Sequence, residues 1–359
     1  MPSFTSNSDS NVYIRQLTEQ LDWRRVIACT LALTVSSLAA TEYYARSQGY
    51  SPSFPQIPDL WVAQWYQLEQ SPDDQLVFIG ASRTQFDLIM DNWEIETGHR
   101  PVMLAWPGSP ADGVLRLLAE RESYRGTVIC GIAPSFTFGS PKLAVHQYIQ
   151  NNLALKDILK WSLSYHISQS VRVPLRNQFL FINEPAFSPI ENLRQFMALN
   201  NREGLLTPLL APFWARQNEK LQSFYTECGE TNPDIIKQVQ EVWNGIMTMQ
   251  VFHGPTDIDK LIKEYTENVK KIKSRGGKVV FIRHPSSDDF LEFEKKHYPR
   301  KDFFDRLCKE TGSLGIHFED YPELADYDCP EWSHLKRDDA IDYTRKIIRI
   351  LNKLSLEAL

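Results

Sequence analysis

Five short apolar segments, each ended by glycine, proline or a polar residue, limit the folds that this chain can adopt. Continuous apolar runs of this length are typical of strands that are buried on both faces of a parallel sheet. Helical patterns alternate with these segments, and this alternation predicts an α/β fold with a parallel central sheet. The expected strands are residues 75–80, 101–106, 127–132, 278–282 and 315–318, and the expected helices are residues 112–121, 256–275, 303–311 and 338–354.

The alternation is interrupted between the third and the fourth expected strand. Residues 140–255 are mostly helical in pattern and rich in aromatic residues, among them Trp161, Trp214 and Trp243. We therefore predict an α/β domain formed by residues 74–139 and 256–359, with residues 140–255 as a helical insertion that covers or flanks the sheet. Residues 47–73 are predicted to form a linker, because residues 47–62 are rich in proline, which the interior of a helix does not accommodate.

The amino-terminal region contains an uncharged segment between Arg25 and Glu42. As a helix, its sixteen residues cover roughly 24 Å, and flanking aromatic and arginine side chains can extend it to both membrane interfaces. We predict a transmembrane signal anchor at residues 23–46, a disordered cytoplasmic tail at residues 1–22, and a carboxyl-terminal domain outside the cytoplasm, since more arginines precede the segment than follow it. A cleaved signal peptide and a helix of a soluble protein are the alternatives.

Charge and cysteine content exclude some function classes. The formal net charge of −6 argues against nucleic acid as a partner, because binding to phosphates needs a basic face. The five cysteines form no C-x-x-C pair, so we expect no metal site, and nothing in the sequence indicates a cofactor. Spacing alone leaves open whether any of these cysteines form a disulfide.

Reactive residue types follow the expected strands at the edge of the sheet where α/β proteins bind ligands. Ser82 follows the first strand, where its hydroxyl can act as nucleophile and its N–H as an oxyanion donor. Gly108 follows the second strand and can offer another N–H to the oxyanion. Near the carboxyl terminus, Glu331 precedes His334 by three residues, so its carboxylate can orient the imidazole as a general base. These residues predict acyl-transfer chemistry.

The arrangement resembles that of the SGNH hydrolases, also called GDSL esterases and lipases. The first motif of that family contains Gly-x-Ser with a nucleophilic serine, and its last has the form Asp-x-x-His-Leu followed by a helix. Residues 80–83 (Gly-Ala-Ser-Arg) and 331–335 (Glu-Trp-Ser-His-Leu) stand at those positions here. The resemblance covers about residues 74–135 and 276–350, and it implies a flavodoxin-like three-layer α/β/α sandwich.

The anchor and the segment Gly-Ala-Ser-Arg-Thr at residues 80–84 are similar to those of two groups of cell-surface proteins. These groups are the alginate O-acetyltransferase accessory proteins and the D-alanine transfer protein of teichoic-acid synthesis. The resemblance implies ester hydrolysis or acyl transfer through an acyl-Ser82 intermediate. It also implies an acylated carbohydrate or lipid ester as substrate, and a membrane-bound acyltransferase as a partner.

Two positions depart from the family pattern. The acid is Glu331 instead of an aspartate, with Asp328 as another candidate, and the third motif lacks the asparagine that supplies an oxyanion donor in the family. Arg83 and His284, which also follow expected strands, are candidates for substrate contact. The departures keep a second hypothesis open, in which the domain is catalytically inactive and binds a polysaccharide or acts as a scaffold. A third hypothesis, in which residues 80–84 bind phosphate, gives His334 no role.

Overall fold

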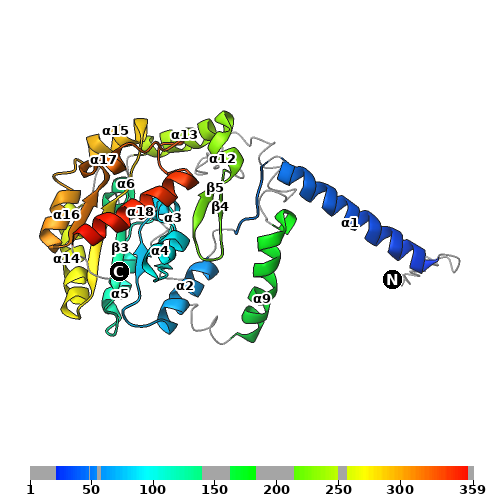
Figure 1. Ribbon diagram of the computed structural model, residues 1–359, viewed down its shortest axis with the longest axis horizontal. Helices are drawn as coiled ribbons and strands as arrows, with labels where there is room; N and C mark the ends of the chain where they lie inside the picture. Colours follow the sequence, from blue (N-terminus) through cyan, green and yellow to red (C-terminus); the bar gives the residue numbers. More distant parts are fainter. Residues whose placement is uncertain are drawn as a thin grey trace, which may run out of the picture. The chain divides into compact units, whose positions relative to one another are not determined.

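The computed structural model describes residues 22–47, 49–54, 58–139, 162–182, 214–249 and 257–354. The chain divides into two compact units, Met1–Tyr44 and Ala45–Leu359. Helix α1 (Trp23–Ser47) provides most of the described part of the first unit and ends in the second (Figure 1). By its length and composition, α1 can cross a membrane, and its large apolar side chains are exposed, as shown by Leu33, which is 70% exposed.

A parallel sheet of five strands forms the centre of the second unit, as the sequence predicts. Its order is β2-β1-β3-β6-β7, and each neighbouring pair is parallel. Most strand residues are buried, since helices cover both faces of the sheet. The strands are β1 (Val77–Ile79), β2 (Val102–Met103), β3 (Thr127–Ile132), β6 (Lys278–Arg283) and β7 (Leu314–His317).

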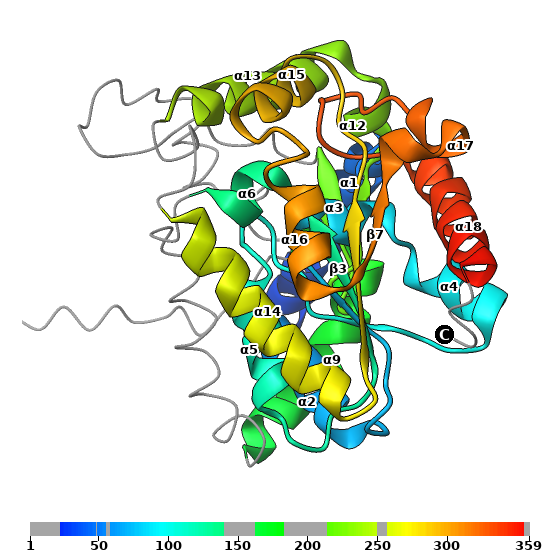
Figure 2. The same cartoon turned by 90° about the vertical axis from the view of Figure 1, so that its left-hand side faces the viewer.

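Two groups of helices cover the sheet (Figure 2). Helix α18 (Arg337–Lys353) packs with α3 (Ser82–Asp87) and α4 (Met90–Thr97) on one face. On the other face, α14 (Ile258–Ser274) packs with α5 (Asp112–Glu120) and α16 (Phe304–Thr311). Each group turns apolar side chains such as Leu115, Val269 and Ile347 into the common core. Shorter elements complete this part of the chain: α6 (Pro134–Phe138), α15 (Asp288–His297), η3 (Phe318–Asp320) and α17 (Pro322–Ala325).

The predicted linker at residues 47–73 is wrong in its second half. Helix α2 (Pro58–Gln70) occupies it and packs Trp61, Trp65 and Leu68 into the core. The helix begins at a proline, because a proline at the first helical position has no intrahelical N–H to lose and its fixed φ suits the helix. The prolines therefore mark the start of a core helix rather than a spacer.

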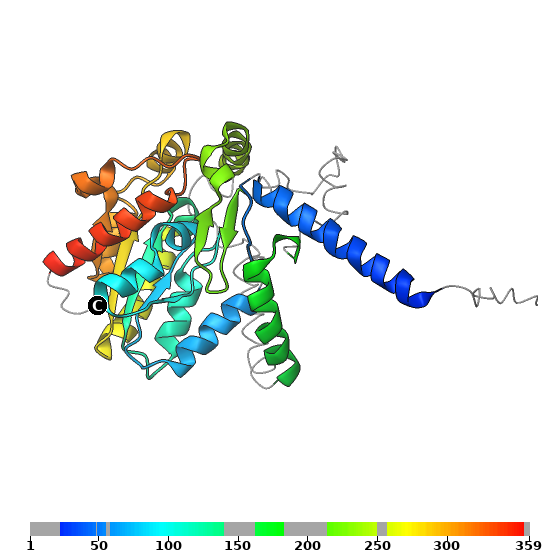
Figure 3. The same ribbon diagram turned by 45° about the vertical axis from the view of Figure 1, so that its right-hand side comes forward.

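The insertion, predicted to be helical, also contains a β-hairpin. Strands β4 (Ala215–Gln217) and β5 (Ser223–Tyr225) pair antiparallel, and the hairpin lies beside α3 (Figure 3). The described helices of the insertion are α9 (Leu163–Gln178), η1 (Leu180–Ile182), α12 (Glu227–Thr231) and α13 (Pro233–Thr248). The rest of the insertion, including Trp161, lies outside the described residues, as do residues 1–21 of the predicted tail.

Candidate active site

The turn after β1 brings Ser82 to the carboxyl edge of the sheet. Gly80 precedes it with a φ of 142°, and a Cβ at this position would lie 2.8 Å from the carbonyl oxygen of Gly131. Only glycine fits this approach of two backbones and this φ. The chain then turns directly into α3, whose first residue is Ser82. The serine is buried, with 8% of its surface exposed, and it lines a cavity.

His334 lies within hydrogen-bonding distance of Ser82, although 252 positions separate them in the sequence. The distance from its Nε2 to the Ser82 Oγ is 2.8 Å. Its Nδ1 lies 2.7 Å from Oε1 of Glu331, so the ring bridges the carboxylate and the hydroxyl. With the proton on Nδ1, the ring donates to Glu331 and presents the Nε2 lone pair to Ser82. Asp328, the other acid considered, is exposed.

Glu331 is 1% exposed, and four donors surround its carboxylate. Oε1 accepts hydrogen bonds from the Tyr225 hydroxyl at 2.6 Å and from the backbone N–H of His334 at 2.8 Å, in addition to the His334 ring. Oε2 accepts from the indole N–H of Trp243. The carboxylate is held against the His334 ring by these hydrogen bonds. It can therefore stabilise an imidazolium at His334.

Sequence reasoning did not find Tyr225 or Trp243. They belong to β5 and α13 in the insertion, and no local motif links them to Glu331. The surroundings of His334 are also aromatic, because Phe86, Trp214 and Trp243 have ring centroids 4.3, 5.7 and 5.9 Å from its imidazole. The insertion thus completes the site around residues that the sheet provides.

A cavity of about 330 Å³ opens beside the serine and is called the Ser82 cavity here. Most of its lining is aromatic or aliphatic. The lining residues are Ser53, Phe54, Ser82, Phe86, Pro107, Gly108, Phe136, Trp214, Ala215, Arg216, Gln217, Ser223, Val242, Trp243, Ile246 and His334. This volume and this apolar character are typical of small-ligand sites.

Gly108 lines the same cavity and has a φ of 65°. Among the described residues, neither its backbone N–H nor that of Ser82 donates to another protein atom. Two backbone donors of residues that line the cavity therefore remain available. After β3 come Ala133, Pro134 and Ser135. The Oγ of Ser135 lies 3.4 Å from Oε1 of Glu294. No asparagine is among the lining residues of the Ser82 cavity.

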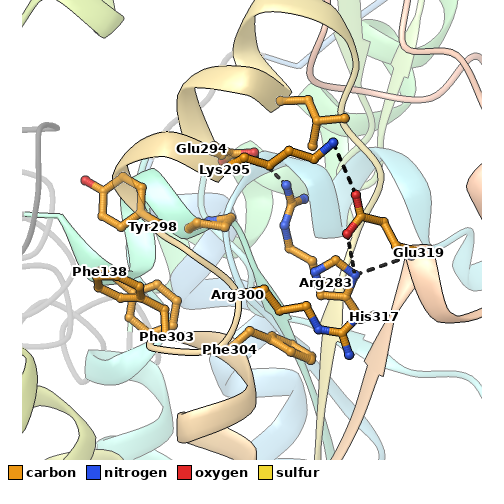
Figure 4. A pocket seen from close by; sticks show the side chains of 12 residues that line it. Phe138, Arg283, Glu294, Lys295, Tyr298, Arg300, Phe303, Phe304, His317 and Glu319 are labelled. Atoms are coloured by element: carbon orange, nitrogen blue, oxygen red, sulfur yellow. Dashed lines mark hydrogen bonds and ion pairs between the residues drawn. The ribbon is translucent and has the colours of Figure 1, made fainter.

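Arg83 does not line the Ser82 cavity; its side chain points into the protein. Its Nη1 lies 3.0 Å from Oε2 of Glu294, and Arg283 binds the same oxygen at 2.7 Å. Figure 4 shows Arg283 and Glu294 beside a separate cavity of about 40 Å³. Burial opposes ionisation of Glu294, but Arg283 and Arg83 outweigh it and lower the pKa of this carboxyl. The position of Arg83 supports a structural role and not the predicted substrate contact.

His284 is fully buried and does not line the Ser82 cavity either. Its Nδ1 lies 3.5 Å from Oδ2 of Asp87. Burial lowers the pKa of His284 well below its ordinary value, with Arg83 and Arg283 adding to the effect. Burial also raises the pKa of Asp87 well above its ordinary value. The predicted substrate contact of His284 is therefore not supported by its position.

No group of His, Cys, Asp and Glu side chains in the described part of the chain is arranged to hold a metal ion. All five cysteines are free thiols.

Comparison with known proteins found no family model and no curated protein that matches this chain. The functional conclusion therefore depends on the geometry of the site.

Proposed function

We propose that this protein is a serine-dependent enzyme that hydrolyses or transfers acyl esters, with Ser82 as nucleophile, His334 as base and Glu331 as the acid partner. One observation carries the proposal: His334 lies 2.8 Å from the Ser82 hydroxyl and 2.7 Å from the Glu331 carboxylate. A nucleophile, a base and an orienting acid at these distances define a catalytic triad on any fold. The cavity beside Ser82 gives an ester access to it.

In the proposed reaction, the Ser82 Oγ attacks the ester carbonyl while Nε2 of His334 takes the hydroxyl proton. The carbonyl oxygen becomes an oxyanion, which the N–H groups of Ser82 and Gly108 stabilise. His334 then donates its proton to the leaving alcohol, and an acyl-Ser82 ester remains. Water resolves this ester in a hydrolase, and a sugar hydroxyl resolves it in a transferase. Glu331 stabilises the imidazolium in both halves of the reaction.

The sheet supports a relationship to the SGNH hydrolases. Numbered along the sheet's own strands, the order β2-β1-β3-β6-β7 corresponds to 2-1-3-4-5, which is the flavodoxin-like order. Helices on both faces agree with a three-layer α/β/α sandwich. The nucleophile follows the first strand, and the base precedes the last helix, as the motifs at residues 80–83 and 331–335 lead us to expect.

The proposed location is the outer side of a membrane, with α1 as a single-pass anchor. The length and composition of α1 support this, and the distribution of arginines around it supports an outward-facing carboxyl-terminal domain. An enzyme tethered there meets envelope polymers and glycolipids. We therefore propose an acylated cell-surface carbohydrate or lipid ester as substrate, with a membrane-bound acyltransferase as the partner that supplies the acyl group.

One alternative is an inactive domain that binds a polysaccharide or acts as a scaffold. The cavity lining contains no asparagine that could provide a third oxyanion donor, and the loss of one donor costs about 10²–10³-fold in rate. The phosphate-loop hypothesis has less support, because it gives no role to the contact between His334 and Ser82.

Two measurements on the full-length protein in detergent test the proposal. The first is turnover of p-nitrophenyl acetate by the wild type, Ser82→Ala and His334→Ala. The second is labelling with a fluorophosphonate, which reacts with activated serines. We expect turnover and labelling that both variants abolish. A folded wild-type protein that neither turns over the ester nor becomes labelled would favour the inactive domain.

A further inference from the structure

Gln217 contributes an amide group to the wall of the Ser82 cavity. It is the last residue of β4 and lies opposite Ser223 of β5, so the two side chains share one face of the hairpin. On this face, the Ser223 hydroxyl lies 3.3 Å from Oε1 of Gln85 in α3, and Tyr225 donates to the proposed catalytic acid. The face that includes Gln217 is therefore the one turned toward the site.

The amide nitrogen of Gln217 is buried without a hydrogen-bond partner. The residue is 8% exposed, and no group in the described part of the chain accepts from Nε2. Among the described side chains that line the cavity, Gln217 is the one with such an unpaired buried nitrogen. A half-turn of the amide exchanges its donor and acceptor ends, so the group can offer either end to a ligand.

The backbone of Gln217 is fixed, in contrast to its amide. Its N–H donates to the Ser53 hydroxyl at 3.0 Å, and its carbonyl oxygen accepts from the N–H of Phe54 at 2.8 Å. Strand β5 pairs with the other edge of β4. The amide is therefore positioned before a ligand binds, and such preorganisation lowers the cost of binding.

The remaining walls of the cavity make this amide selective. Five of the lining residues are aromatic: Phe54, Phe86, Phe136, Trp214 and Trp243. An alkyl chain that filled the cavity would leave the amide of Gln217 unpaired, and a site with an unpaired buried polar group binds such a ligand poorly. A sugar ring combines hydroxyls, which can pair with the amide, with C–H faces that pack on aromatic rings.

We propose that Gln217 binds a hydroxyl of the substrate, and that the Ser82 cavity therefore takes esters of carbohydrates rather than esters of lipid alcohols. The inference rests on the proposed acyl chemistry at Ser82 and specifies its substrate class. A hydroxyl suits the amide in either orientation, because it can donate to the amide oxygen or accept from the amide nitrogen. In a largely apolar cavity, one such polar contact fixes how the ligand is oriented.

A matched pair of esters tests the proposal in the full-length protein, kept in a detergent without a sugar head group. Methyl 6-O-acetyl-glucopyranoside is compared with (tetrahydropyran-2-yl)methyl acetate, which has the same ring and the same primary acetate but no hydroxyls. Release of acetate measures both reactions. We expect the wild type to prefer the sugar ester by about tenfold in kcat/KM, the effect of pairing one buried polar group.

Gln217→Met replaces the amide by an apolar side chain of similar length, so the ratio of the two kcat/KM values should fall toward one. Gln70→Met is the matched control, because it makes the same change at an exposed position of α2 that does not line the cavity. Urea unfolding should show Gln217→Met to be at least as stable as the wild type, since an unpaired buried group is removed. A wild type without preference, or a preference that Gln217→Met leaves intact, would overturn the proposal.

A binding measurement separates this inference from the proposed catalysis. Ser82→Ala keeps the cavity and removes the nucleophile, so its affinity for the two intact esters can be compared by calorimetry. We expect the sugar ester to bind about tenfold more tightly, and Gln217→Met in the same background to remove the difference. If the wild type hydrolyses no ester but the sugar ester is still preferred, only the catalytic proposal fails. Equal affinities together with Ser82-dependent turnover would reject only the role of Gln217.

Discussion

Asp87 accepts a hydrogen bond from the backbone N–H of Leu335, with 3.1 Å between its Oδ1 and the amide nitrogen. Asp87 is the last residue of α3, the helix that begins with Ser82, and Leu335 directly follows His334. The short helix that carries the nucleophile therefore also holds the segment that carries the base. The Thr344 hydroxyl of α18 reinforces this connection by donating to the Asp87 carbonyl oxygen at 3.1 Å.

We predict that Asp87 positions His334 through Leu335. Asp87→Asn keeps an oxygen acceptor at Oδ1, so kcat should change by less than about threefold. Asp87→Leu leaves the buried N–H of Leu335 without an acceptor, which costs about 1–3 kcal/mol, and kcat should fall at least tenfold as the ring shifts. Ester turnover and urea unfolding of both variants measure the two effects. Equal activity of Asp87→Leu and the wild type would exclude the positioning role.

The raised pKa of Asp87 gives the Asn variant a second readout. Because burial raises the folded-state pKa above the ordinary value of 3.8, the unfolded chain loses this proton at lower pH than the folded protein does. The stability that Asp87 contributes is therefore lost as pH rises from about 4 through the folded-state pKa. Asp87→Asn should remove this decline. The free energies of unfolding of the variant and the wild type should be measured between pH 4 and pH 8. Their difference should become smaller as the pH falls.

Burial of His284 makes the folded protein less stable in acid, whereas burial of Asp87 makes it less stable as the pH rises. Burial, with Arg83 and Arg283, lowers its folded-state pKa well below 6.5, so the unfolded chain takes up this proton first as pH falls. Its contribution is lost below about pH 6.5, by up to about 1.4 kcal/mol per pH unit. We predict that His284→Gln has a shallower loss of stability between pH 6.5 and pH 4.5. An unchanged slope in urea unfolding experiments would show that His284 is already protonated in the folded protein.

The short-range part of the site could be predicted from the sequence. Ser82 follows a buried strand, and Glu331 and His334 are three residues apart before a helix, so each has a local pattern that places it at the sheet edge. The rule that ligand sites lie at the carboxyl ends of parallel strands places Ser82 at this edge, but His334 lies well beyond β7 (Leu314–His317). Its contact with Ser82 was expected from the motif positions of the family that the chain resembles.

The orientation of a side chain at that edge could not be predicted in the same way. Arg83 and His284 follow their strands as expected, but partners from distant elements, Glu294 and Asp87, determine which way they point. Tyr225 reaches Glu331 from a hairpin with three-residue strands, which are too short for a periodic signal. The prolines before α2 suggested a linker, because a proline that ends a helix and one that begins it look alike in sequence.

The donors around Glu331 lead to a third prediction. Tyr225→Phe removes one hydrogen bond to Oε1 of Glu331, and Trp243→Phe removes the one to Oε2. Each buried hydrogen bond to a charged group contributes about 1.5–3 kcal/mol. We expect kcat/KM to fall about tenfold in each single variant, because the carboxylate is less well held against the His334 ring. If both groups act through Glu331, the double variant in a Glu331→Gln background should show no further loss.

The ion pairs of Glu294 lead to the fourth prediction, which concerns stability. Glu294→Gln leaves two buried guanidiniums, those of Arg83 and Arg283, without a counter-ion. Breaking a buried ion pair in this way typically costs about 3–5 kcal/mol. Glu96→Gln is the control, because Glu96 pairs with Arg345 at 3.2 Å on the surface, where such a pair contributes less than about 1 kcal/mol. Urea unfolding of the two variants gives both values.

Because Arg83 is adjacent to Ser82 and also lies 3.3 Å from the Ser333 hydroxyl, the loss in Glu294→Gln should extend to catalysis. We expect kcat to fall even at temperatures where the variant is fully folded, since Arg83 then loses its charged partner and keeps only the contact with Ser333, so that the turn that carries Ser82 becomes less ordered. A variant that unfolds more easily but retains full kcat when folded would show that the network around Glu294 supports the fold alone.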